Sequence, residues 1–162
     1  MTDLKDHEPE ELGQTPEATN AACVFCAIIA GDRPADVILR EGEPGSPTGV
    51  VAFLDVRPLF KGHVLVVPSA HVVTLPDLPA AGLGPLFGAV QRIARAVEEG
   101  LGAHGSFVAM NNKVSQSVPH LHVHVVPRRR KDGLRGFFWP REPYGSDAER
   151  VEIAGRIKAA LR

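Results

Sequence analysis

Three histidines alternate with apolar residues in the stretch SVPHLHVHVVPRR, which spans residues 117–129. His120, His122 and His124 occupy every second position, and successive side chains of a β-strand point to opposite faces of the sheet. We therefore expect the three imidazoles on one face of a strand, with the apolar residues between them on the core side. A single histidine so placed is usually an ordinary surface residue, but three of the chain's seven in strict alternation indicate a functional site.

The composition is that of one globular domain: 162 residues, of which 44% are hydrophobic and 23% charged. A formal net charge of −1 argues against nucleic acid or an anionic membrane as the general partner. Apolar runs stay well below the ~20 residues of a membrane helix, so no membrane association is expected. Residues 1–20 are acidic and polar and lack the apolar core of a secretion signal. This predicts a disordered tail, a domain over residues 21–162 with a C-terminal helical extension, and a cytoplasmic location.

The pattern of apolar residues predicts a mainly antiparallel α+β domain, because strands follow one another with few helices between them. A short apolar segment at residues 23–30 comes first. The strands are expected at residues 37–40, 49–56, 62–68, 106–111 and 120–127. The main helix lies within residues 75–102, and a capping-box pattern at Ser146 and Glu149 opens a terminal amphipathic helix.

A row of imidazoles suits nucleophilic catalysis, because imidazole is both a nucleophile and a proton carrier near neutral pH. The serine and the backbone amides of the loop before the row could face the oxygens of a substrate. The chain has neither the G-x-S-x-G pattern of serine hydrolases nor a phosphate-binding P-loop. The histidines are therefore the candidate nucleophiles.

Four segments resemble the histidine triad (HIT) family, in the family's order: CVFCAIIAGDRPA, VAFLDVRP, GHVLVVPSAH and SQSVPHLHVHVVPR. The last contains the signature in which three histidines alternate with apolar residues. The resemblance implies a HIT-like fold, with an antiparallel sheet of about five strands and two main helices, usually paired as a homodimer. It also implies transfer or hydrolysis of a nucleoside monophosphate at the α-phosphate of a nucleotide.

The resemblance implies a role for each residue of the catalytic group. His122 would be the nucleophile that forms a nucleotidyl-histidine intermediate, and His124 would bind phosphate or hold the tautomer. His63, from the strand GHVLVVP, would complete the histidine cluster. Ser117 would bind the phosphate and assist the leaving group.

The resemblance also implies a pocket for a purine nucleotide, with AMP and GMP both open as the nucleotide part of the substrate. Asp55 would bind the ribose hydroxyls. The base would be surrounded by Ile28, Phe53 and Val56. His124, already assigned to the catalytic group, would also contact the substrate.

The loop before the histidine row would supply further substrate contacts. Asn111 most resembles the family's polar contact from the preceding strand, and Asn112 is an alternative. Gln116 and Ser117 would face the phosphate. The loop departs from the common GQS form, because Ser115 stands where glycine is usual.

Cys23 and Cys26 form a C-x-x-C pair, which by itself fits two buried small residues, a redox pair or half of a zinc site. In a chain without an export signal, a reduced pair is favoured over a structural disulfide. Zinc needs four ligands, and the resemblance to bacterial HIT proteins implies His71 and His120 as the other two. Such a site has no open position, so the zinc would be structural.

Nucleoside phosphoramidase is the favoured function within the group of nucleotide hydrolases and transferases that the resemblance implies. A dinucleoside polyphosphate hydrolase or phosphorylase is the alternative enzyme, and a nucleotide-binding regulator with vestigial catalysis is the alternative from another class. The basic run at residues 128–131 leaves open a deadenylase of DNA ends, although the near-neutral charge makes nucleic acid a disfavoured partner. The aromatic run at residues 137–139 suggests packing at a subunit interface or near the pocket mouth.

Overall fold

A computed structural model describes residues 23–134 and 143–160 of the chain. The tail expected over residues 1–20 and the aromatic run at residues 137–139 lie outside the described residues. The elements, in chain order, are α2 (Val24–Ala30), β1 (Val37–Glu41), β2 (Val50–Leu54), β3 (Val64–Pro68), the 3-10 turn η1 (Leu75–Asp77), α3 (Ala80–Leu101), β4 (Gly105–Ala109), β5 (Val123–Arg128) and α4 (Asp147–Ala160).

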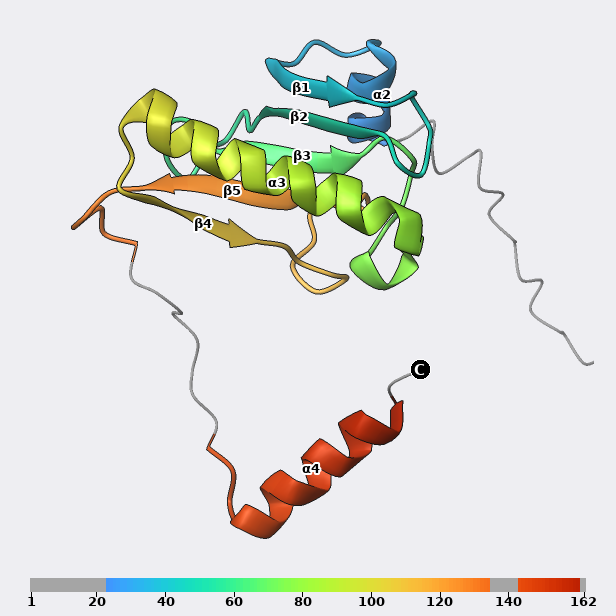
Figure 1. The fold of residues 1–162 in the computed structure, drawn as a ribbon, viewed down its shortest axis with the longest axis vertical. Coiled ribbons are helices and arrows are strands. Elements are labelled where there is room, and N and C mark those ends of the chain that lie inside the picture. The colour runs from blue at the N-terminus through green and yellow to red at the C-terminus, as the bar shows by residue number, and fades with distance from the viewer. Residues whose placement is uncertain (1–22, 135–142, 161–162) are drawn as a thin grey trace, which may run out of the picture. The chain divides into compact units, whose positions relative to one another are not determined.

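The strands form one five-stranded sheet in the order β1-β2-β3-β5-β4, and every neighbouring pair is antiparallel (Figure 1). This confirms the α+β class and the five-stranded antiparallel sheet. The pairing of β3 with β5 places Leu65 opposite His124 and Val66 opposite Val123. The histidine row therefore enters the middle of the sheet rather than its edge.

Helices α2 and α3 pack on opposite faces of the sheet, and each face contributes to its own apolar cluster. Along β2, Val50 and Ala52 belong to the α3 cluster, whereas Val51 and Phe53 belong to the α2 cluster. The central strands β2 and β3 are consequently buried on both faces, as their unbroken apolar sequences require.

The apolar segment at residues 23–30 is a seven-residue helix, α2, which the sequence alone did not predict. It ends at Gly31, whose φ of 87° gives the left-handed C-cap conformation that favours glycine. The Arg40 guanidinium of β1 donates hydrogen bonds to the carbonyls of Ile29 and Ile28, at 2.6 and 3.5 Å. These bonds satisfy carbonyls of the last turn and fix α2 against the edge strand.

Residues 131–162 form a second compact unit. The amide of Glu149 donates to the Ser146 hydroxyl at 3.1 Å, which confirms the predicted cap of α4. The prediction of an amphipathic helix is wrong, because the apolar residues of α4 are spread around the helix rather than gathered on one face. None of the helices in the described residues is long and apolar enough to cross a membrane.

Candidate active site

The histidine row begins just before β5 and runs into it, so only His124 belongs to the hydrogen-bonded strand. The predicted alternation is present, since the intervening Leu121 and Val123 lie in the α3 cluster. The other face is also covered: the ring of Phe25 in α2 stands edge-on to His120 and His122, at centroid distances of 5.9 and 5.3 Å. His120 and His122 are therefore buried rather than outward-facing.

The tautomer of His122 is set by the backbone two residues earlier. Its Nδ1 lies 2.6 Å from the carbonyl oxygen of His120, and a carbonyl can only accept a hydrogen bond. The neutral ring must therefore carry its proton on Nδ1 and its free lone pair on Nε2. Because His122 lines the pocket, Nε2 is the candidate nucleophilic atom.

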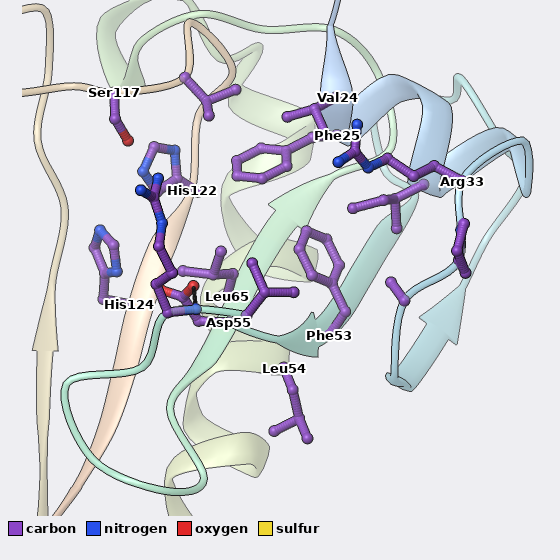
Figure 2. A pocket seen from close by; sticks show the side chains of 16 residues that line it. Val24, Phe25, Arg33, Phe53, Leu54, Asp55, Leu65, Ser117, His122 and His124 are labelled. Atoms are coloured by element: carbon purple, nitrogen blue, oxygen red, sulfur yellow. Dashed lines mark hydrogen bonds between the residues drawn. The ribbon is translucent and has the colours of Figure 1, made fainter.

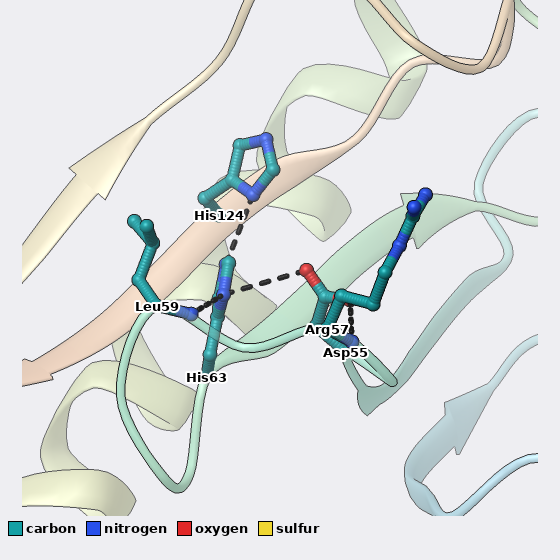
Figure 3. Close-up of polar contacts among 5 residues, drawn as sticks. All are labelled: Asp55, Arg57, Leu59, His63 and His124. Atoms are coloured by element: carbon teal, nitrogen blue, oxygen red, sulfur yellow. Dashed lines mark hydrogen bonds and ion pairs between the residues drawn. The ribbon is translucent and has the colours of Figure 1, made fainter.

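His63 and His124 form a hydrogen-bonded chain behind the pocket (Figure 3). The Leu59 amide donates to Nδ1 of His63 at 3.2 Å, so the proton of neutral His63 is on Nε2. That N–H donates to Nδ1 of His124 at 2.9 Å and leaves a proton on Nε2 of His124. His124 thus offers an N–H donor beside His122, with ring centroids 5.0 Å apart.

Burial keeps the imidazoles of His63 and His124 neutral. It lowers the pKa of His124 to about 4, with the nearby His122 and His63 adding to the shift and Asp55 opposing it. Burial likewise lowers the pKa of His63, and here the carboxylate of Asp55, 3.4 Å from Nδ1, acts in the opposite direction. Near pH 7 each ring therefore has one donor and one acceptor nitrogen, as the chain of hydrogen bonds requires.

The pocket has a volume of about 430 Å³, within the range of small-molecule sites. One end is polar, and Figure 2 shows the Ser117 hydroxyl pointing toward His122 there. The remainder is mainly apolar. The full lining is Val24, Phe25, Ile28, Arg33, Pro34, Ala35, Phe53, Leu54, Asp55, Val56, Arg57, Leu65, Ser117, Val118, His122 and His124.

The structure brings most of the predicted nucleotide-binding residues together in this pocket. Those lining it are Ile28, Phe53, Asp55, Val56, Ser117 and His124, and His63 stands directly behind His124. Asp55 accepts a hydrogen bond from the Arg57 amide at 2.8 Å through one carboxylate oxygen. Its other oxygen is the one near His63.

Three polar residues of the preceding loop lie outside the pocket lining and hold the loop instead. Asn111 donates to the carbonyl of Ser115 at 3.2 Å, and Asn112 accepts from the Leu75 amide at 2.7 Å. Gln116 accepts from the Lys113 amide and donates to the Val73 carbonyl, at 2.8 and 2.7 Å. Ser115 has a φ of 59°, the conformation for which glycine is usual at this place.

Several lining residues were not predicted from the sequence. Phe25 precedes Ile28 by three positions, so recognising α2 as a helix would have placed both on one face. Arg33 and Arg57 bring two guanidinium groups to a pocket that otherwise has one carboxylate among its lining residues. Nothing in their local sequence marks them, because tertiary packing brings both to the cavity.

The four predicted metal ligands are gathered in one place. Sγ of Cys23, Sγ of Cys26 and one nitrogen from each of His71 and His120 all lie within 4.8 Å of one another. The sulfur-to-Nδ1 distances are 3.5 Å for Cys23–His120, 3.2 Å for Cys26–His71 and 3.6 Å for Cys26–His120. Tetrahedral zinc with ordinary bond lengths separates a sulfur and a nitrogen ligand by about 3.5 Å. The cluster therefore fits a zinc ion.

The surroundings of the cluster support the same conclusion. Nε2 of His120 donates to the Pro68 carbonyl at 2.9 Å, which leaves the lone pair of Nδ1 facing the cysteines. Burial lowers the pKa of His120 to about 4, so this ring is neutral, as a metal ligand must be. Burial and the neighbouring Cys23 raise the pKa of Cys26 to about 12, and paired thiolates here would need a cation beside them. Cys23 and Cys26 are not joined in a disulfide, so both sulfurs can serve as metal ligands.

The five-stranded sheet, the histidine chain and the pocket define a class of α+β protein with a histidine-lined small-molecule pocket, and the comparisons supply its family. The HIT domain model matches residues 44–131. The chain belongs to the HIT family.

Several relatives are similar over half of the chain or more. A HIT-like protein of Mycobacterium tuberculosis is 41% identical over 126 residues, 75% of this chain and 83% of that protein. The adenosine 5'-monophosphoramidase of Schizosaccharomyces pombe is 30% identical, covering 85% of this chain and 99% of that one. The asymmetrical bis(5'-nucleosyl)-tetraphosphatase of the same yeast is 37% identical, and the alignment covers 50% of this chain and 46% of that protein.

Among solved structures, a HIT family protein of Bacillus subtilis has a TM-score of 0.75 at 33% identity, covering 87% of this chain and 98% of that one. A zinc-bound histidine triad protein of Mycobacterium smegmatis has a TM-score of 0.64 at 39% identity, covering 88% of this chain and 99% of its own. These likenesses confirm the HIT fold.

Proposed function

We propose that the protein is a hydrolase of purine nucleotide conjugates that acts through a nucleotidyl-histidine intermediate, and that its leaving group is an amine. The observation that carries the proposal is the hydrogen bond from Nδ1 of His122 to the His120 carbonyl, because it directs the lone pair of Nε2 to the pocket. The proposed reaction is therefore that of a nucleoside phosphoramidase.

The chemistry divides into two displacements at the α-phosphorus. Nε2 of His122 attacks phosphorus, the P–N bond to the amine breaks, and the amine nitrogen takes up a proton as it leaves. The Ser117 hydroxyl and the N–H of His124 are the donors near the reacting group, and they also stabilise charge on the phosphate oxygens. Water then attacks phosphorus, one of its protons replaces the proton given to the amine, the bond to Nε2 breaks, and the nucleoside monophosphate departs.

The remaining pocket residues would position the nucleotide. The Asp55 carboxylate would accept hydrogen bonds from the ribose hydroxyls, next to the histidine chain. The apolar side chains of Phe25, Ile28 and Phe53 would pack against the base. This arrangement follows from placing the phosphorus at His122, since the apolar end of the cavity is then left for the base.

Zinc is proposed as the metal of the Cys23, Cys26, His71 and His120 cluster. With four protein ligands it would have no site for water or substrate, so its contribution would be structural. The solved structure of the zinc-bound Mycobacterium smegmatis protein supports the assignment. A homodimer and a cytoplasmic location stay predictions.

A dinucleoside polyphosphate hydrolase is the second candidate, and Arg57 is the observation that favours it. This guanidinium lines the same pocket as His122 and could receive the phosphates of an anionic leaving group. The phosphoramidase is preferred because the relative with that name matches almost its whole length, whereas the tetraphosphatase matches less than half of its own.

The test measures turnover of an adenosine phosphoramidate carrying a fluorogenic amine and of a diadenosine polyphosphate. Wild type should cleave the phosphoramidate faster, and His122→Ala should lose at least ~10³-fold in kcat. His104→Ala is the matched control, because His104 is an exposed histidine outside the pocket lining. Preference for the dinucleotide would establish the second candidate. Tight AMP binding without turnover of either compound would instead indicate a nucleotide-binding regulator.

A further inference from the structure

Arg33 lies at the end of the pocket that is left for the base. It follows the C-cap of α2, and the amides of Asp32 and Arg33 both donate to the Ala27 carbonyl, at 2.9 and 3.2 Å. Pro34, with its restricted backbone, comes next and also lines the cavity. These contacts fix the backbone of Arg33 at the end of α2, and its side chain lines the cavity.

The Arg33 side chain is exposed at the rim of the pocket. Figure 2 shows it extending toward Phe25 and Val24, on the side of Phe25 away from His122. Among residues 23–134 and 143–160, no hydrogen bond or ion pair holds this guanidinium, although Asp32 precedes it in the chain. A planar group with five N–H donors therefore stands at the base end of the pocket with its donors available.

A guanidinium, which has only hydrogen-bond donors, can distinguish guanine from adenine by the edge of the base. Guanine presents two adjacent acceptors, O6 and N7, which arginine binds through two parallel hydrogen bonds. Adenine presents N7 beside its N6 amino group, which is itself a donor and would oppose the guanidinium. We infer that Arg33 reads the edge of the base and makes the pocket prefer 6-oxopurine nucleotides over adenine nucleotides. The inference rests on the proposed function, which places a purine nucleotide in this pocket.

The second pocket arginine does not share this role. The backbone amide of Arg57 is bonded to Asp55, whose other oxygen lies by His63, so Arg57 begins at the histidine end of the cavity. Stacking of the Arg33 guanidinium on the face of the base is the competing geometry. Stacking acts on adenine and guanine alike, and only edge recognition gives a preference between them.

The experiment measures the affinity of the full-length protein for GMP, IMP and AMP by titration calorimetry. GMP and IMP share O6 and N7, so both should bind wild type about 5- to 100-fold more tightly than AMP. Arg33→Ala should remove this preference by weakening GMP and IMP while leaving AMP within about twofold. Arg33→Lys, which keeps the charge but not the paired donors, should retain only part of the preference.

Arg95→Ala is the matched control, because Arg95 is an exposed arginine of α3, on the other face of the sheet. It should keep the wild-type preference. Equal affinity of wild type for the three nucleotides, or equal losses for all three in Arg33→Ala, would overturn the inference while His122-dependent hydrolysis remained intact. Failure of all three nucleotides to bind would overturn the proposed function, and the inference with it.

Discussion

Truncating Phe25 to alanine is expected to loosen helix α2 from the sheet. Phe25 is 7% exposed and packs edge-on against Phe53, with ring centroids 5.4 Å apart, as well as against His120 and His122. Phenylalanine-to-alanine changes in cores cost about 3–5 kcal/mol of unfolding free energy. Because Phe25 also borders the pocket, water can fill part of the space it leaves, so the lower end, about 3 kcal/mol, is expected.

For a folded unit of this size, about 3 kcal/mol corresponds to a fall in Tm of roughly 9–15 °C. Thermal unfolding followed by circular dichroism, with and without a zinc chelator, measures this fall. Val56→Ala is the control, since Val56 lines the same pocket but is 88% exposed and should change Tm by less than about 2 °C. A fall in Phe25→Ala no larger than in Val56→Ala would refute the argument that this ring holds α2 to the sheet.

Two further outcomes follow from the cysteine cluster and from the loop before the histidines. The purified protein should contain about one zinc per chain by elemental analysis, and Cys26→Ser should reduce the content to less than about a fifth and lower Tm. A Cys26→Ser protein with full zinc and unchanged Tm would contradict the proposed ligand set. Ser115→Gly should raise the free energy of unfolding by about 0.5–1 kcal/mol, because glycine adopts the 59° φ of this position without the penalty of a Cβ atom. Denaturant unfolding measures the gain, and a loss of stability would show that the serine side chain contributes more than its backbone strain costs.

The sheet could be predicted from the sequence because each strand carries its own local signal. Segments such as VVAFL and VLVVP are short, apolar and rich in β-branched residues, and they became β2 and β3. Helix α2 has no such signal. It is seven residues long, contains Val24 and two isoleucines, and has no side-chain hydrogen bond at its N-cap, so its helical form depends on packing against the sheet.

The residues of the candidate site were likewise predictable only where a local sequence pattern marks them. The alternation of the histidine row and the C-x-x-C pair are local patterns, and the residues that they indicated lie together in the structure. Residues whose roles depend on long-range packing were not predictable. Arg33 reaches the pocket only because α2 packs on the sheet, and the side chain of Gln116 binds the Val73 carbonyl across 43 positions of sequence.

The two-residue spacing of His120 and His122 does more than place their rings on one face: it links the cysteine cluster to the tautomer of His122. The side chain of His120 belongs to the cysteine cluster and is tied through Nε2 to the Pro68 carbonyl, while its own carbonyl accepts the proton of Nδ1 of His122. Whatever fixes the side chain of His120 therefore also fixes the acceptor that decides which nitrogen of His122 is free. Movement of that carbonyl would let the proton occupy either nitrogen and would reduce the fraction of rings with a nucleophilic Nε2. His120 thus couples the proposed metal cluster to His122, the proposed nucleophile two positions later in the chain.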